Sequence, residues 1–255
     1  MSADWRLRRL RRLEVLDNEQ LQAMLAADPR KAAQALVIAA GQGVVDAQAL
    51  LGQILLDGRG IERDAALALK WFAIAASRGH AMAHNMLGRC HEHGWGCEAS
   101  AERAAGHYLH AARAGLDWGL YNLANLLGTG RGLALDHARA FACYLQAATM
   151  GHAKSMNLVG RYLEQGLVMA ADLPAPKVWY KRSAQAGDFR GQFSHAAMLA
   201  EEGDIDTAVM WLQRALEGGN TNFLRSSVAV LEQARQPAIK AMATLYAQRL
   251  QALEG

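Results

Sequence analysis

Apolar residues recur along most of the chain at the spacing of an amphipathic helix, and short glycine-rich stretches interrupt them at regular intervals. Residues 46–58, DAQALLGQILLDG, carry apolar side chains at helical spacing and end on a glycine suited to the left-handed conformation that follows many helices. The next residues, GRGI, form a turn, and a second helix begins after Asp64. The pattern therefore predicts paired helices joined by short turns.

This two-helix unit repeats with a period of 36 residues. A glycine closes each unit after a pair of small residues, as Gly43, Gly79, Gly115, Gly151 and Gly187. A strict period of this length, with one helix-turn-helix per unit, is typical of a solenoid. One position of the first helices also stays small, which lets the two helices of a unit approach closely; it holds Gly52, Gly88, Ala124 and Gly160.

Side chains that can cap a helix recur in the same register. The residue before each predicted second helix can accept hydrogen bonds from the free amides of a first turn, and these residues are Asp28, Asp64, Ser100, Asp136 and Asp172. Pro29, Pro174 and Pro176 fall in predicted first turns, where a missing amide hydrogen costs little. We expect Pro237 to open the last helix.

The repeat drifts towards both ends of the chain. Residues 28–43 fit the second helix of a degenerate first unit, whose first helix is expected around residues 17–27. After Gly187 one unit is shorter, and residues 220–253 predict two more helices without the motif. We therefore divide the chain into a basic N-terminal helix with a degenerate capping repeat (1–43), a repeat array (44–219) and C-terminal capping helices (220–255).

The units resemble Sel-one-like repeats, which are relatives of the tetratricopeptide repeat. The likeness covers roughly residues 28–219 and rests on Leu-Gly in the first helix, the G-x-G turn, an aspartate near the second helix, an aromatic pair such as Trp71-Phe72 and the closing Ala-Ala-x-x-Gly. It implies an all-α, right-handed α-α superhelical solenoid of about five to six helix pairs. The resemblance also implies that the concave face binds proteins or peptides, as in an adaptor, regulator or scaffold.

Charge and cysteine content narrow the expected setting. The formal net charge is only +3, and the arginines before residue 13 account for it, so the rest of the chain gives no indication of a nucleic-acid partner. The three cysteines form no even-numbered framework, which disfavours the disulfide-bridged secreted relatives. Because the start lacks a secretory apolar stretch and no run approaches the ~20 apolar residues of a spanning helix, we expect a cytoplasmic protein.

Polar residues that recur in the middle of the first helices mark a candidate binding face. A solenoid helix buries its two flanks, so we expect this stripe to be exposed, to line the groove and to bind a peptide that carries carboxylates or exposed backbone. The candidate partner-binding residues are Asn85, Arg89, Tyr121, Asn125, Asn157 and Arg161. The alternative is an ordinary solvated face that binds no ligand.

Residues 90–97, CHEHGWGC, place two cysteines and two histidines close together, with His80, His84, His107 and His110 nearby, and such a set could bind zinc or copper. The repeat register argues against this interpretation. Cys90, His91 and Cys97 align with positions that are apolar in the other units, so we expect them to belong to the core or its edge. We predict no metal and no other cofactor.

The segment 5–13, WRLRRLRRL, predicts a basic amphipathic helix. It could meet a membrane surface, nucleic acid or an acidic protein, but leucines that cap the first repeat beneath solvated arginines are the simpler interpretation.

Motifs of catalysis are missing from the sequence. It has no Walker-type phosphate loop, no G-x-S-x-G elbow and no H-E-x-x-H, and its glycine pairs follow helices, so they are turns. We therefore expect a non-enzymatic protein-protein interaction module. The alternatives are a dedicated inhibitor or immunity-type protein that occludes one enzyme, and a metal- or nucleic-acid-binding module.

Overall fold

The structure is a computed structural model that describes residues 23, 26–168 and 174–254. In this part of the chain it contains thirteen α-helices and no strand, which confirms the predicted all-α class. The chain divides into two compact units, Met1–Leu135 and Asp136–Gly255. No helix among the described residues is both long enough and apolar enough to cross a bilayer.

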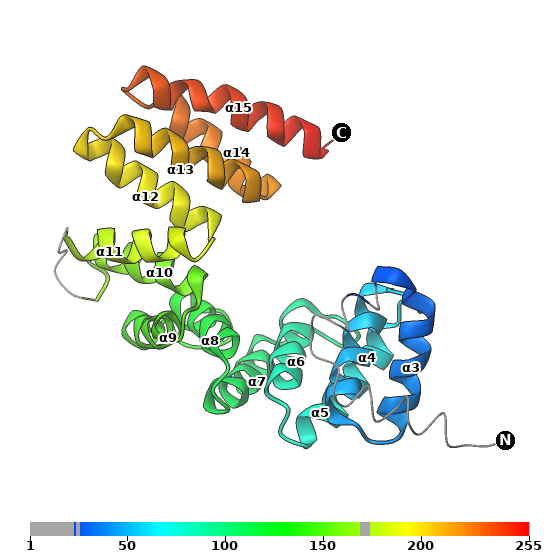
Figure 1. The fold of residues 1–255 in the computed structure, drawn as a ribbon. Helices are drawn as coiled ribbons and strands as arrows, with labels where there is room; N and C mark the ends of the chain where they lie inside the picture. Colours follow the sequence, from blue (N-terminus) through cyan, green and yellow to red (C-terminus); the bar gives the residue numbers. More distant parts are fainter. Residues whose placement is uncertain (1–22, 24–25, 169–173, 255) are drawn as a thin grey trace. The chain divides into compact units, whose positions relative to one another are not determined.

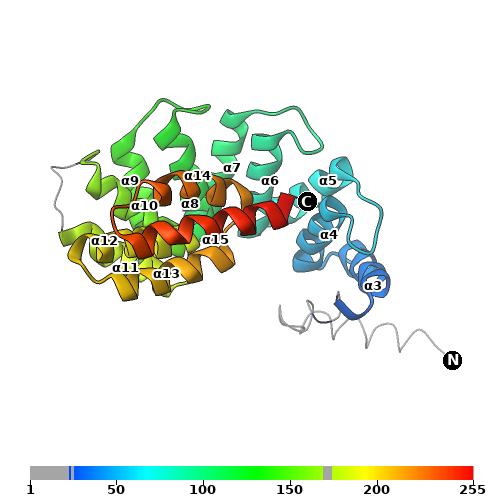
Figure 2. The same cartoon turned by 90° about the horizontal axis from the view of Figure 1, so that it is seen from above.

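The described part of the first unit consists of α3 (Pro29–Gly41), α4 (Val45–Asp57), α5 (Ala65–Ser77), α6 (Ala81–His93), α7 (Ala101–Arg113) and α8 (Asp117–Thr129). Each helix packs chiefly on the helices that precede and follow it in the chain. Figures 1 and 2 show these helices as successive pairs lying side by side. This packing between sequence neighbours is that of a solenoid.

The second unit contains α9 (His137–Thr149), α10 (Ala153–Glu164), α11 (Pro174–Gln185), α12 (Phe189–Glu202), α13 (Ile205–Gly218), α14 (Thr221–Glu232) and α15 (Pro237–Glu254). The predicted short repeat is α12 with α13, which Gly203 joins at a φ of 88°. The two expected terminal helices are α14 and α15, and the second begins at Pro237 as predicted. Contacts also join α10 to α12 and α13 to α15, so equivalent helices of adjacent repeats stack.

Side-chain caps explain where the second helices begin. Asp28, Asp64, Ser100 and Asp136 each accept a hydrogen bond from the amide three residues later, at 2.8–3.3 Å. The prediction is therefore confirmed for these four residues. Asp172 and the first helix expected around residues 17–27 fall outside the residues for which the structure can be described in full.

Histidines cap two of the first helices, a role that the sequence did not suggest. His80 Nδ1 accepts from the Ala83 amide at 3.0 Å, and His152 Nδ1 accepts from the Ser155 amide at 3.2 Å. Asp188 occupies the equivalent place before α12 and accepts from the Gly191 amide. The turn position after the repeat glycine is thus a second capping position in three repeats, whereas Val44 and Leu116 occupy it before α4 and α8 and make no side-chain cap.

The G-x-G turns serve both the helix that ends and the preceding repeat. Gly58 ends α4 in the left-handed conformation, with a φ of 71°, as predicted. Two residues on, Gly60 lies against the start of α3, where an added Cβ would be 2.1 Å from the Pro29 carbonyl oxygen. Gly96 lies in the same way against the Ala65 carbonyl oxygen of α5. The second glycine is therefore required by close packing between repeats.

Within a helix pair, the small position of the first helix faces an aromatic ring of the second. A Cβ added at Gly52, Gly88 or Gly160 would lie 2.4–2.7 Å from the ring of Phe72, Tyr108 or Tyr180, respectively. These three rings are buried, and alanines make up much of the remaining core. The predicted close approach of the two helices is confirmed in these three repeats, where the ring lies directly on the glycine.

We expect Gly88→Val to lower the free energy of unfolding by roughly 2–3 kcal/mol, because the new side chain must displace the Tyr108 ring. Gly106→Val is the matched control, since Gly106 lies in α7 with open space around it and its change should stay within about 0.5 kcal/mol. Urea unfolding followed by circular dichroism measures both. Equal effects of the two substitutions would contradict the packing argument.

Candidate partner-binding face

Asn85 opens the predicted polar stripe on α6, but the structure buries it. Its side chain is 3% exposed, and its Oδ1 accepts a hydrogen bond of 2.9 Å from Asn122 Nδ2 of α8. The expectation that Asn85 faces solvent was therefore wrong. A short polar side chain at this position satisfies a partner in the next repeat, which the periodicity of a single helix cannot reveal.

Glu92, two turns along the same helix, is also used within the protein. It accepts a hydrogen bond of 2.6 Å from the Tyr108 hydroxyl of α7 and another of 2.6 Å from Arg131, which follows α8. Burial raises the pKa of Tyr108 well above its usual value, and the nearby Glu92 carboxylate raises it further. Tyr108 therefore acts as a neutral hydrogen-bond donor, and Glu92 links α6, α7 and the turn after α8.

Arg89 lies between Asn85 and Glu92 on α6, and it is half-exposed. Its guanidinium lies over the Trp95 ring, 5.0 Å from the ring centroid, and one of its nitrogens is 3.9 Å from the Met86 sulfur. A guanidinium held over an indole ring moves less freely, which lowers the entropy that is lost when a carboxylate binds it. The structure thus places a pre-positioned cation on α6.

Tyr121 and Asn125 are half-buried on α8. Trp118, one turn earlier, is 37% exposed and meets the Tyr121 ring edge to face at 5.8 Å between centroids. The Asn122 contact with Asn85 and the Arg131 contact with Glu92 hold α8 beside α6 at two levels. We call the surface formed by Arg89, Trp95, Trp118, Tyr121 and Asn125 the α6–α8 face.

The second unit repeats the arrangement two periods later. Asn157 of α10 is 3% exposed and accepts a hydrogen bond of 3.1 Å from Ser194 of α12, so its expected exposure was wrong for the same reason. Glu164 accepts from the Tyr180 hydroxyl at 2.6 Å. Arg161, between them, is exposed. In both units, the asparagine and the glutamate on the first helix support packing. The arginine between them reaches the surface.

Trp95 and Trp118 were missed as candidate residues. Both flank the predicted stripe in the sequence, but their relation to Arg89 and Tyr121 depends on side-chain contacts within the first unit. A tryptophan next to a glycine turn is the only signal that could have marked Trp95.

Cys90 lies in the core and His91 and Cys97 lie at its edge, as the repeat register predicted. Cys90 is completely buried, and burial raises the pKa of its thiol to about 11, so it stays protonated at neutral pH. Cys97 Sγ lies 3.4 Å from His91 Nδ1, and burial also raises the pKa of this thiol. Among the described residues, no group of three or more His, Cys, Asp or Glu side chains is placed to hold a metal ion.

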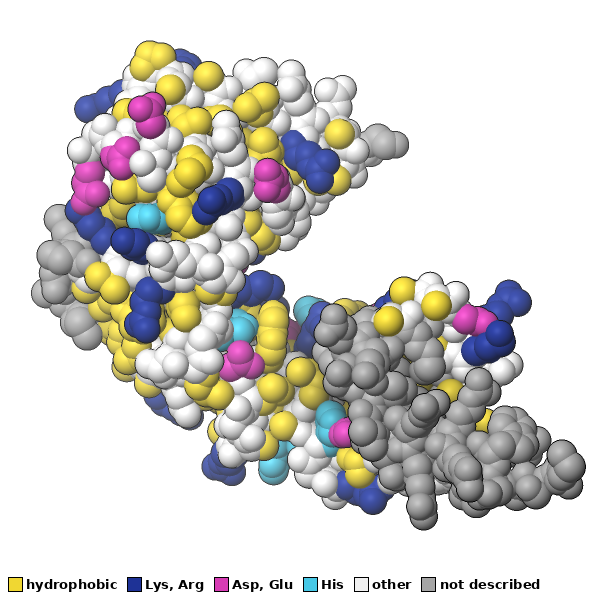
Figure 3. Space-filling view, in the orientation of Figure 1, with side chains coloured by type: hydrophobic (Ala, Val, Ile, Leu, Met, Phe, Trp, Pro, Cys, Tyr) yellow, Lys and Arg dark blue, Asp and Glu magenta, His cyan; other side chains and the backbone are white. Residues whose placement is uncertain are grey.

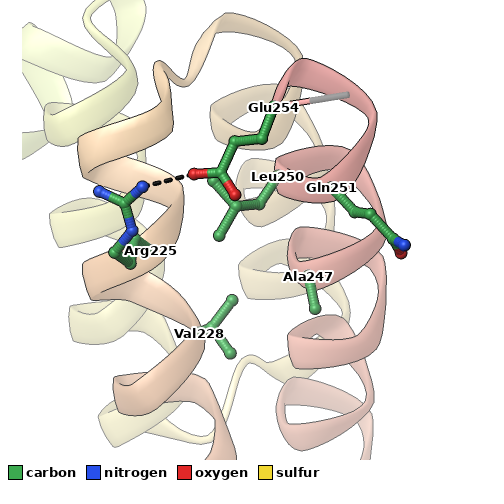
Figure 4. A pocket seen from close by; sticks show the side chains of 6 residues that line it. All are labelled: Arg225, Val228, Ala247, Leu250, Gln251 and Glu254. Atoms are coloured by element: carbon green, nitrogen blue, oxygen red, sulfur yellow. Dashed lines mark hydrogen bonds and ion pairs between the residues drawn. The ribbon is translucent and has the colours of Figure 1, made fainter.

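A shallow hollow lies on the second unit between α14 and α15. It has a volume of about 480 Å³ and is lined by Arg225, Val228, Ala247, Leu250, Gln251 and Glu254. Figure 4 shows the ion pair of Arg225 with Glu254 across one end, and Val228, Ala247 and Leu250 along its sides. The hollow is mainly apolar and carries no acid-base pair suited to catalysis.

Charged side chains do not gather into one large patch on the surface in view. Figure 3 shows Lys, Arg, Asp and Glu interspersed with hydrophobic side chains on each unit. The arginine-rich segment 5–13 lies outside the described residues, so its predicted capping role stays a prediction.

Comparison with known proteins decides the family. The family model of the Sel1 repeat matches residues 45–80, 81–116, 119–152, 153–188 and 198–220, which together cover more than half of the chain. The chain belongs to the Sel1 repeat family. Proteins of this family are generally protein-interaction modules, and their solenoid fold is typically a non-catalytic scaffold. Among curated proteins, no sequence matches this Sel1 repeat protein.

Solved structures agree with the fold. A Sel1 repeat protein from Oxalobacter formigenes is 24% identical, with a TM-score of 0.76 over 88% of this chain and 92% of its own. A protective antigen of uropathogenic Escherichia coli with an SLR fold is 26% identical, with a TM-score of 0.68 over 88% of this chain. The match spans only 49% of that antigen's length. An immunity protein from Pseudomonas aeruginosa is 16% identical, with a TM-score of 0.58 over 83% of this chain and 82% of its own.

The Tyr108–Glu92 hydrogen bond should behave as a coupled pair. Either Tyr108→Phe or Glu92→Leu alone should cost about 1–3 kcal/mol of stability, because each leaves a polar partner in a poorly hydrated place. The double variant copies the first repeat, where Phe72 and Leu56 occupy the equivalent positions, and should cost clearly less than the sum. Urea unfolding of the four proteins measures this coupling; additive losses would show that the hydrogen bond is unimportant.

Proposed function

We propose that this Sel1 repeat protein is a non-enzymatic interaction module that binds a protein or peptide partner on its first helices, with the α6–α8 face as its main contact. The observation that carries the proposal is the half-exposed Arg89, whose guanidinium lies over Trp95, on a helix that the Asn122–Asn85 hydrogen bond joins to α8. Arginine, tryptophan and tyrosine are the residue types that contribute most to binding energy at protein interfaces.

The chemistry of this face favours a partner segment that presents a carboxylate next to an apolar side chain. The guanidinium of Arg89 can donate two parallel hydrogen bonds to a carboxylate, and the Trp118 and Tyr121 rings offer apolar area on the neighbouring α8. Glu92 does not oppose an anionic partner strongly, because Arg131 already pairs with it. Arg161, exposed on α10, is a separate candidate carboxylate contact on the second unit.

The buried polar contacts of α6 also support the proposal, because they fix the helix in place. Asn85 and Glu92 hold α6 against its neighbours before any partner arrives, so little conformational entropy is lost on binding. Asn157 is not part of the proposed contact, because it is buried and bonded to Ser194.

A narrower possibility is a dedicated inhibitor of one enzyme. Its support is limited to fold similarity, since solved immunity proteins from Pseudomonas aeruginosa share the fold at 14–16% identity. An inhibitor and an adaptor would use the same face, and they differ in whether the bound partner loses its catalytic activity.

The experiment begins with photo-crosslinkers placed at Trp118 and, as a control, at Leu109, an exposed residue of α7. A partner crosslinked from Trp118 is identified by mass spectrometry, purified and titrated calorimetrically. We expect Arg89→Glu and Tyr121→Ala each to weaken binding by at least about 10-fold, since each removes roughly 1.4 kcal/mol or more.

Arg113→Glu is the matched control, because it makes the same charge change at an exposed site in the last turn of α7 and should leave affinity unchanged. Unchanged affinity for both Arg89→Glu and Tyr121→Ala would refute the α6–α8 face as the contact. An activity assay of the partner, with and without this protein, then separates inhibitor from adaptor.

A further inference from the structure

Four imidazole rings form a continuous row between α6 and α7. The order is His110, His84, His107 and His91, with successive ring centroids 4.9, 5.7 and 5.3 Å apart. The outer pairs are stacked nearly parallel, and Nδ1 of His84 faces Nδ1 of His107 at 3.4 Å. At the far end, His91 Nδ1 meets the Cys97 thiol.

In this geometry, only some of the four imidazole rings can be protonated at the same time. Two facing Nδ1 atoms can share one hydrogen bond only if at most one of them carries a proton, and two stacked imidazolium ions would repel each other at about 5 Å. The other groups that act on these rings are His80, Cys97 and Arg103. None of the causes of these shifts is a carboxylate from the described parts of α5, α6, α7 or α8.

Sequence register makes the row more unusual. In the other repeats, the position of His107 holds Trp71, Cys143, Trp179 or Trp211, and the position of His84 holds Gln48, Leu120 or Met156. The second repeat therefore places histidines, which can take up a proton and become cationic, where these repeats have side chains that cannot become cationic. The histidines are not required by the solenoid.

We propose that the histidine row of α6 and α7 is an acid-sensitive latch that packs these helices tightly when its rings are neutral and loosens them when the rings take up protons. Since α6 also carries Arg89, the α6–α8 face would weaken in acid, a consequence that rests on the proposed function. The latch itself does not depend on any partner, and neither does its test.

The pH window follows from the direction of the shifts. Burial, reinforced by His91, His84 and His110, lowers the pKa of His107 to about 4 from an unfolded value near 6.5. Burial also lowers the pKa of His84 and of His91. A ring with a depressed pKa stabilises the fold above pH 6.5, and this contribution is lost as the pH falls towards 4, because the unfolded chain binds more protons.

Hydrogen exchange on the intact chain tests the latch. From pH 7 to pH 5, His107 alone should lower the protection factors of amides in α6 and α7 by on the order of 20-fold. His107→Gln should remove most of this change, because glutamine has a similar size and does not titrate. His93→Gln is the matched control; His93 is exposed at the end of α6, contacts Trp95 and lies outside the row.

A nuclear magnetic resonance titration of the unmodified protein tests the latch even if the His107→Gln variant fails to fold. One imidazole should titrate near pH 4 and two others below 6.5. The proposal is overturned if the rings of His84, His91 and His107 all titrate near 6.5. It is equally overturned if a folded His107→Gln protein loses as much protection in acid as the unmodified chain.

Discussion

The contact between a helical glycine and an aromatic ring is the interaction on which three of the repeats depend; in the repeat that contains α8, Ala124 occupies the small position. With no Cβ at Gly52, Gly88 or Gly160, the ring of the second helix lies directly on the backbone of the first. The two helices therefore approach closely and bury a large ring. Because this contact is made within a single helix pair, the surface residues of a repeat can vary while the spacing between its two helices stays the same.

Contacts between repeats rely on polar groups at fixed positions. Asn85 with Asn122 and Asn157 with Ser194 are the same interaction made two periods apart, and each joins the first helices of neighbouring repeats. Buried amides need such partners, since an unpaired one would cost about 1–3 kcal/mol. Some of the side chains in the predicted binding stripe therefore hold neighbouring repeats together. Arg89 and Arg161 make no such contact in the hydrogen bonds described above and can bind a partner.

The second repeat combines two features within the first unit. Its first helix carries Arg89 on one face, while His84 and His91 of the same helix pack against the histidines of α7. A helix that supports a binding face and also contains a titratable contact can couple the two, because loosening one side of a short helix changes the support of the other. Neither feature alters the glycine and aromatic contact that defines the repeat.

The sequence by itself determined the period, the helix pairs, the capping residues and the close helix approach, because these depend on local spacing and on residue types with strong conformational preferences. Asp64 as a cap and Gly58 as a helix end follow from such preferences alone. Only the tertiary structure decided that Asn85 is buried while Arg89 is accessible, and that four histidines from two helices form one row. The physical reason is that burial and hydrogen-bond partners across a helix boundary depend on how one repeat rotates against the next, which a periodic pattern does not specify.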